Sequence, residues 1–119
     1  MSAQPVERPD LPLFPMPPLA EAALRAAVKR IDLAEAVRFE QEFRDAWQEA
    51  VQTDSTIPMR TFLFRWAVFV SLHRYPARSA RFRELERAVG SAESQDEARA
   101  AASEVHYLLK AATDEVRAG

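Results

Sequence analysis

The segment from Thr56 to Tyr75 carries apolar side chains on two sides of a helical wheel. Residues three and four positions apart share a face of an α-helix, so this segment has one broad apolar face and a narrower stripe almost opposite. Because both sides need cover, we predict either the central helix of a small bundle or a core helix that keeps one face for a partner chain. The broad face contains Met59, Phe62, Leu63, Trp66, Phe69, Val70 and His73, and the second stripe contains Phe64, Val68 and Leu72.

Two further helices are predicted before this segment. The first begins with Pro18 near its first position and runs to about Arg30. Asp32 stands at the N-cap of the second, with Glu35 three residues later, and that helix runs to about Gln52. Its apolar side holds Leu33, Ala36, Phe39, Phe43, Ala46, Trp47, Ala50 and Val51, and its acidic side holds Glu35, Glu42, Asp45 and Glu49.

Two more helices follow Pro76, which ends the central helix. One spans about Ala77 to Val89 and is expected to close on Gly90 in a left-handed C-cap. The last begins after the N-cap Ser94 and carries a narrow apolar stripe rich in alanine. No window alternates with a period of two, so the pattern predicts an all-α fold, a compact bundle of about five helices.

The N-terminal segment is rich in proline, since six of the chain's eight prolines lie in the first 18 residues. Proline excludes a helix or a central strand there, so we predict an extended arm over residues 1–17 and a helical bundle domain over residues 18–119. The arm's apolar residues could pack on the chain's own bundle or on a partner. They are Leu11, Leu13, Phe14 and Met16.

Composition narrows the functional classes. A chain of 119 residues with 48% hydrophobic and 29% charged residues suits one folded domain. It has no cysteine and two glycines, which excludes thiolate chemistry, cysteine-ligated metals and glycine-rich phosphate loops. The sequence has no membrane-span pattern and no signal-peptide pattern, so we expect a cytoplasmic protein.

The sequence offers no pattern typical of catalysis. His73 lies on an apolar face, and neither it nor His106 has a metal-binding spacing such as HExxH, so both are interpreted as structural or surface residues. No serine-centred elbow is present. We therefore expect a protein that is not an enzyme and that has no catalytic residues, metal site or cofactor.

Two charged residues interrupt apolar stripes, Glu40 in the second helix and Arg78 in the fourth. A buried charge needs a partner, so we predict a structural ion pair between Glu40 and Arg78, with Arg44 or Arg65 as alternatives for the glutamate.

Net charge is −2 but its sign is unevenly distributed. Residues 32–54 contain seven acids and two arginines, whereas residues 60–87 contain seven arginines and two glutamates. The arginines around the fourth helix form a basic rim that could bind an acidic partner or nucleic acid, or could be balanced by nearby acids. They are Arg74, Arg78, Arg81, Arg83 and Arg87.

Residues 62–86 resemble a family of small uncharacterised helical proteins from actinobacteria. The resemblance lies in three motifs: Arg65-Trp66-Ala67-Val68, Pro76-Ala77-Arg78 and Arg83-Glu84-Leu85-Glu86. Some members of that family are associated with toxin–antitoxin gene pairs, so the resemblance implies a partner-binding role.

Together these observations predict a small non-enzymatic protein-interaction or regulatory protein, antitoxin-like, that binds a protein partner or a second copy of itself. The alternative is a DNA-binding transcriptional regulator that uses the arginine-rich helix 77–89. No membrane or small-molecule partner is expected. The predicted contact residues are Leu11, Leu13, Phe14, Met16, Phe64, Val68, Leu72, Arg74, Arg81, Arg83 and Arg87.

Overall fold

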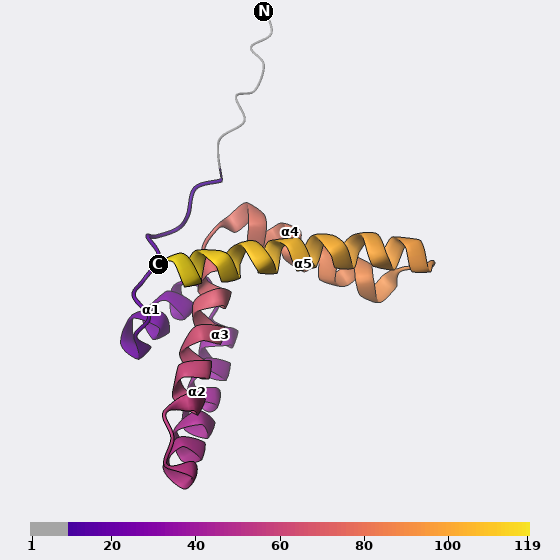
Figure 1. Ribbon diagram of the computed structural model, residues 1–119. Coiled ribbons are helices and arrows are strands. Elements are labelled where there is room, and N and C mark those ends of the chain that lie inside the picture. The colour runs from indigo at the N-terminus through magenta and orange to yellow at the C-terminus, as the bar shows by residue number, and fades with distance from the viewer. Residues whose placement is uncertain (1–9) are drawn as a thin grey trace, which may run out of the picture.

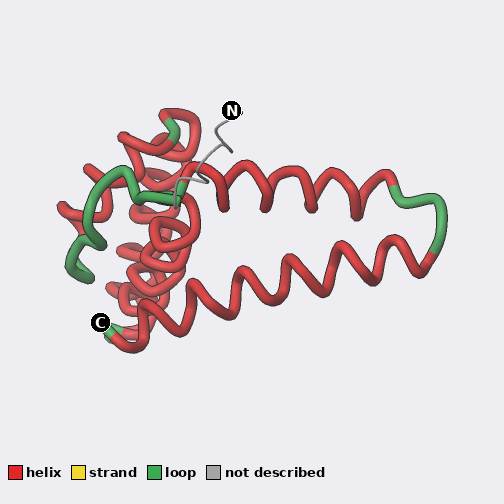
Figure 2. The backbone as a smooth tube through the Cα atoms, turned by 90° about the horizontal axis from the view of Figure 1, so that it is seen from above, coloured by secondary structure: helices red, strands yellow, loops and turns green. Residues whose placement is uncertain are grey.

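The computed structural model describes residues 10–119, which form five α-helices and no strand, so the predicted all-α helical bundle is confirmed. Helices α2 and α3 lie side by side, and α4 and α5 form a second antiparallel pair that crosses the first (Figure 1). Seen from above, the turn between α4 and α5 points away from the other helices (Figure 2). The helices are α1 (Glu21–Ile31), α2 (Leu33–Thr53), α3 (Ile57–His73), α4 (Pro76–Ser91) and α5 (Gln95–Ala118).

Local capping chemistry sets most of these boundaries. The Asp32 carboxylate accepts hydrogen bonds from the N–H groups of Ala34 and Glu35 and so starts α2, with Asp32 as the single residue between α1 and α2. The Ser94 hydroxyl accepts from the Glu97 N–H and starts α5. At α3 the Ser55 hydroxyl accepts from the Ile57 N–H, and Pro58 occupies the first turn, where a missing donor costs nothing.

The predicted C-cap at Gly90 is wrong. Helix α4 continues through Gly90 to Ser91, and no described glycine has a positive φ. The helix ends instead at Ala92, whose backbone is extended. Glycine permits a left-handed cap but does not impose one, since it also adopts helical dihedral angles.

Helix α3 is covered on both sides, as a helix apolar on two faces requires. Its broad face contributes Phe62, Trp66 and Val70 to a core shared with α1 and α2, in which Phe39 packs edge-to-face on Phe62 and Trp66. Its second stripe meets a smaller cluster built with α4 and α5. That cluster consists of Leu72, Phe82 and Ala112, with Val68, Val105 and Leu108 packed against it.

The described part of the N-terminal arm, from Asp10 to Pro17, rests on the chain's own bundle; the predicted arm residues 1–9 lie outside the described residues. Phe14 and Met16 pack against the larger core. The Leu13 N–H donates to the Arg74 carbonyl oxygen at 2.8 Å, and the Arg30 guanidinium lies 4.9 Å from the Phe14 ring centroid. The arm was expected to pack either on the chain's own bundle or on a partner, and its described part packs on the bundle.

Asp10 caps α4 from a distance in sequence. Helix α4 begins at Pro76, and Tyr75 before it provides no side-chain cap. The Ala77 and Arg78 N–H groups donate to the two carboxylate oxygens of Asp10, each at 3.2 Å. A carboxylate at this position also opposes the positive end of the helix dipole, so the arm stabilises the helix that it crosses.

We therefore expect Asp10→Ala to lower the free energy of unfolding by about 1 kcal/mol, the usual value of an N-cap. Urea denaturation followed by circular dichroism measures the change. Glu86→Ala removes an exposed carboxylate of α4 that makes no ion pair in the described part of the chain and serves as the matched control. Equal stabilities of the two variants would contradict the capping role.

Candidate interaction groove

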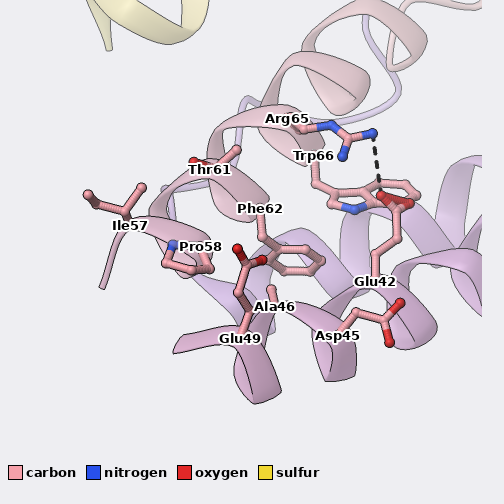
Figure 3. A pocket seen from close by; sticks show the side chains of 10 residues that line it. All are labelled: Glu42, Asp45, Ala46, Glu49, Ile57, Pro58, Thr61, Phe62, Arg65 and Trp66. Carbon is pink, nitrogen blue, oxygen red and sulfur yellow. Dashed lines mark ion pairs between the residues drawn. The ribbon is translucent and has the colours of Figure 1, made fainter. Parts of the chain in front are cut away.

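A groove runs between α2 and α3 (Figure 3). Its volume is about 360 Å³, and its floor is apolar, formed by Ala46, Phe62 and Trp66 with Ile57 and Pro58 at one end. Figure 3 shows the Phe62 and Trp66 rings directed from α3 toward α2, beneath carboxylates that α2 contributes. The acidic side predicted for the second helix thus forms one wall of this groove.

A second hollow of about 240 Å³ continues the groove into the inner corner between the two helix pairs. It shares Glu42, Arg65 and Trp66 with the first, so the two hollows adjoin, and we call them together the trough. The Arg65 guanidinium lies 3.4 Å from the Glu42 carboxylate at that junction (Figure 3). The corner is lined mainly by apolar side chains, namely Val68, Phe69, Leu72, Phe82 and Leu109.

The rim of the trough is acidic. Four carboxylates from α2 face two guanidinium groups, and both arginines already contact Glu42. Asp45 accepts a hydrogen bond from Gln41 but neither Asp45 nor Glu49 forms an ion pair within residues 10–119. Their charge is available to a cation from outside the chain. The rim residues are Glu35, Arg38, Glu42, Asp45, Glu49 and Arg65.

His73 lies at the deep end of the corner. Its Nδ1 lies 2.7 Å from the Ser79 hydroxyl oxygen, and its ring packs against Phe69 and Phe82. Burial lowers the pKa of His73 from 6.5 to about 4; the positive charge of Arg83 acts in the same direction, and Asp32 opposes it. The imidazole is therefore neutral at pH 7, in keeping with a structural rather than an acid–base role.

Arg74 was predicted as part of a surface rim, but this prediction is wrong because Arg74 is buried, with 6% of its surface exposed. Its guanidinium donates to the Glu115 carboxylate at 2.7 Å, to the Phe14 carbonyl oxygen at 3.1 Å and to the Tyr75 hydroxyl at 3.2 Å. Arg74 thus ties the N-terminal arm to the C-terminal part of α5.

Two of the other four arginines of the predicted rim, Arg81 and Arg83, form ion pairs with acids of this chain. Arg81 contacts Glu104 at 2.6 Å and also Glu84, and Arg83 lies 3.4 Å from Asp32. The pKa of Arg81 is raised above its usual value by the hydrogen bond to Glu104. Arg87 is exposed and forms no ion pair within the described segment.

The predicted ion pair between Glu40 and Arg78 does not form. Glu40 instead accepts hydrogen bonds from Arg25 of α1, which lowers the pKa of the glutamate, and Arg78 lies over the Tyr75 ring, 4.2 Å from its centroid. Glu40 is half-buried and Arg78 exposed, so neither is the deeply buried charge that its place in an apolar stripe indicated.

The other predicted contact residues lie in different parts of the structure and differ in how exposed they are. Val68 and Leu72 line the corner, although Leu72 is 4% exposed and belongs to the core. Phe64 is half-buried with the Arg117 guanidinium 5.6 Å from its ring centroid. Leu11 and Leu13 stay largely exposed on the arm, whereas Phe14 and Met16 pack inward. These residues are therefore distributed over the molecule rather than gathered in one patch.

Within residues 10–119 no three His, Asp or Glu side chains are placed to hold a metal ion. No helix in that range is both long and apolar enough to cross a bilayer. No family model, curated protein or solved structure matches the chain. The resemblance of residues 62–86 to an actinobacterial family therefore stays a prediction.

Sequence reasoning did not identify the trough, although its elements were present. The sequence pattern gives an acidic side of α2 and places Trp66 and Phe69 on the broad face of α3, but it does not show that the two sides meet. The useful signal was the acidic residues without nearby basic ones on the same helix, since Asp45 and Glu49 have no lysine or arginine four residues further along.

Proposed function

We propose that this protein is a non-enzymatic protein-interaction protein that binds an amphipathic helix of a partner, apolar on one face and rich in lysine or arginine along its flank. The trough between α2 and α3 is the binding site. The observation that carries the proposal is an apolar floor next to the carboxylates of Asp45 and Glu49, which have no cation partner in the described residues. A regulatory role such as that of an antitoxin, which masks a basic partner protein, is one form of this activity.

The chemistry of the trough supports this class of ligand. A helix buries an apolar stripe in a groove formed by two other helices, and here Ile57, 68% exposed, offers apolar surface beside the ring edges of Phe62 and Trp66, which are 5% and 4% exposed. The acidic rim favours a basic flank on the incoming helix and disfavours an acidic one, so charge determines which helices bind.

The alternative of DNA binding through α4 receives little support from the geometry. Arg81 and Arg83 contact Glu104 and Asp32, and Arg74 is buried, so α4 presents no continuous basic surface to a phosphate backbone. A DNA complex that weakens steeply with salt and is lost in Arg83→Ala with Arg87→Ala would favour this alternative over the trough.

Calorimetric titration tests the proposal with two synthetic amphipathic helices, one of leucine and lysine and one of leucine and glutamate. We expect the lysine peptide to bind and the glutamate peptide not to bind. Asp45→Lys with Glu49→Lys should lower the affinity for the lysine peptide at least about tenfold, since each charge reversal removes an attraction and adds a repulsion.

The control reverses two exposed acids away from the trough, Glu86→Lys with Asp96→Lys, which gives the same change in net charge. This variant should bind the lysine peptide as the unmodified protein does. The proposal is overturned if both double variants weaken binding equally, or if the NMR shifts caused by the peptide avoid the Trp66 indole.

A further inference from the structure

Helix α2 carries a second apolar surface that its own chain does not cover. The side chains recur at spacings of four and three residues, so they share one stripe along the helix. Sequence analysis placed Leu33, Trp47 and Val51 with the core residues, but the structure leaves them outside. Leu33 is 75% exposed, Val37 72%, Trp47 58% and Val51 64%. We call this surface the α2 outer stripe; its members are Leu33, Val37, Glu40, Arg44, Trp47 and Val51.

The order of residues along the stripe is symmetric about position 42. If a second α2 lies antiparallel across a two-fold axis at that position, Leu33 faces Val51 of the other copy, and Val37 faces Trp47. Glu40 then faces Arg44 at the centre, and the symmetry makes that charge pair twice. This arrangement suits an antiparallel coiled coil, in which the apolar layers at both ends stabilise the pair and the central charges favour this orientation.

We propose that the protein forms a homodimer in which the α2 outer stripes of two copies pack antiparallel, with Glu40 of each copy paired to Arg44 of the other. The stripe binds a second copy because it is complementary to itself: its apolar residues face apolar residues of the other copy, and Glu40 faces Arg44. A parallel pair would set Glu40 against Glu40 and Arg44 against Arg44, which repel.

Within one chain Arg44 is free for the pairing, and Glu40, although held by Arg25, stays partly exposed. The Arg44 guanidinium makes only a 3.5 Å contact with Gln41 and no ion pair in residues 10–119. The Glu40 side chain is 40% exposed, so its carboxylate can accept from Arg44 of a second copy while Arg25 holds it from behind. A shallow hollow among Trp47, Gln48, Val51 and Gln52 lies where the opposing Leu33 would rest.

The dimer goes beyond the proposed function and does not depend on it. Asp45 and Glu49 of the trough lie on a different side of α2 from the outer stripe. On a helical wheel of about 100° per residue, they are about 120° or more from the centre of the stripe. Loss of the dimer and loss of peptide binding are therefore distinguishable with variants on the two sides.

The absence of cysteine allows a direct test of the pairing. Chains with Val37→Cys are mixed with chains carrying Trp47→Cys and oxidised with glutathione. We expect a disulfide between positions 37 and 47 of different copies. Neither variant should cross-link to itself, because ten residues of helix separate the two like positions by about 15 Å, more than a disulfide spans.

Sedimentation equilibrium tests the assembly itself. The mass should rise with concentration from the chain mass of 13.5 kDa toward twice that value. Val37→Glu should raise the dimer dissociation constant at least about 100-fold, because the symmetry introduces each substitution twice. Arg44→Glu should do the same through repulsion from Glu40, whereas the control Arg60→Glu, off the stripe on α3, should leave the mass unchanged.

Three results would overturn the dimer. They are a constant mass of 13.5 kDa throughout the concentration series, self-cross-linking of Val37→Cys chains alone, and an equal effect of Arg44→Glu and Arg60→Glu.

Discussion

Arg74→Ala is expected to lower the free energy of unfolding by about 2 kcal/mol, because a buried guanidinium with several hydrogen bonds is removed while the partly exposed Glu115 carboxylate gains water in its place. The guanidinium is buried, and its loss leaves the Glu115 carboxylate without its cation and the Phe14 carbonyl without its donor. Three segments lose their common contact at once, namely the arm, the end of α3 and α5. Urea denaturation followed by circular dichroism measures the change.

The same variant should also release the arm. Hydrogen exchange at the Leu13 amide, which donates to the Arg74 carbonyl oxygen, reports that release separately from global unfolding. Arg60→Ala, an exposed arginine on α3, is the control and should change neither quantity beyond about 0.5 kcal/mol. If Arg74→Ala unfolds no more easily than this control, Arg74 is a surface residue after all.

A double-mutant cycle identifies the partner. Glu115→Gln leaves Arg74 with its arm contacts but without a carboxylate, and the coupling between the two sites should be favourable by about 1 kcal/mol or more. If the substitutions at positions 74 and 115 show no coupling energy, Arg74 stabilises the fold through its contacts with the arm and not through Glu115.

Much of the fold could be predicted because its causes are local. Asp32 and Ser94 act as N-caps through hydrogen bonds to amides two and three residues away, so the sequence around each is sufficient. The two-sided pattern of α3 depends only on helical periodicity, and it led to a central position in the bundle. The prediction of a C-cap at Gly90 failed because glycine allows both a helical and a left-handed backbone, and its local sequence does not decide between them.

The sites were harder to predict because they depend on contacts between distant segments. Glu40 pairs with Arg25, and nothing in the sequence of either helix gives the rotation that brings α1 over α2. Asp10 caps a helix that begins 66 residues later. Arg74 differs from Arg78 only in lying where the arm and α5 meet, so its burial follows from tertiary structure and not from its local pattern.

Helix α2 shows how one element serves three environments. Phe39 faces the core, Asp45 and Glu49 line the trough, and Val37 and Trp47 face outward. Periodicity detected an apolar and an acidic side but merged the core residues with the outer stripe. The centres of the two stripes are only about 100° apart on the helical wheel, so together they look like one wide apolar side. Exposed apolar residues along a whole helix are uncommon without a partner, so the assembly proposed for this surface would account for them.

Acidification from pH 6.5 to pH 4 should cost the folded state about 3 kcal/mol through His73 alone. The pKa of this histidine is lowered from 6.5 to about 4 in the folded chain, mainly by burial. Between these two values the unfolded chain binds a proton that the folded chain does not, so stability falls as the pH falls. The contribution is complete above pH 6.5, decreases through the window and is lost below about pH 4.

Subtraction isolates this effect from the titration of carboxylates. The free energy of unfolding is measured at several pH values for the unmodified protein and for His73→Phe, whose ring suits the site beside Phe69 and Phe82. We expect the variant to lose about 3 kcal/mol less over the same range, whereas Val89→Phe, at an exposed position that holds no ionisable group, should lose as much as the unmodified protein. Parallel curves for all three proteins would mean that His73 is protonated in the folded chain near its ordinary pKa, which a ring enclosed by two phenylalanines should not allow.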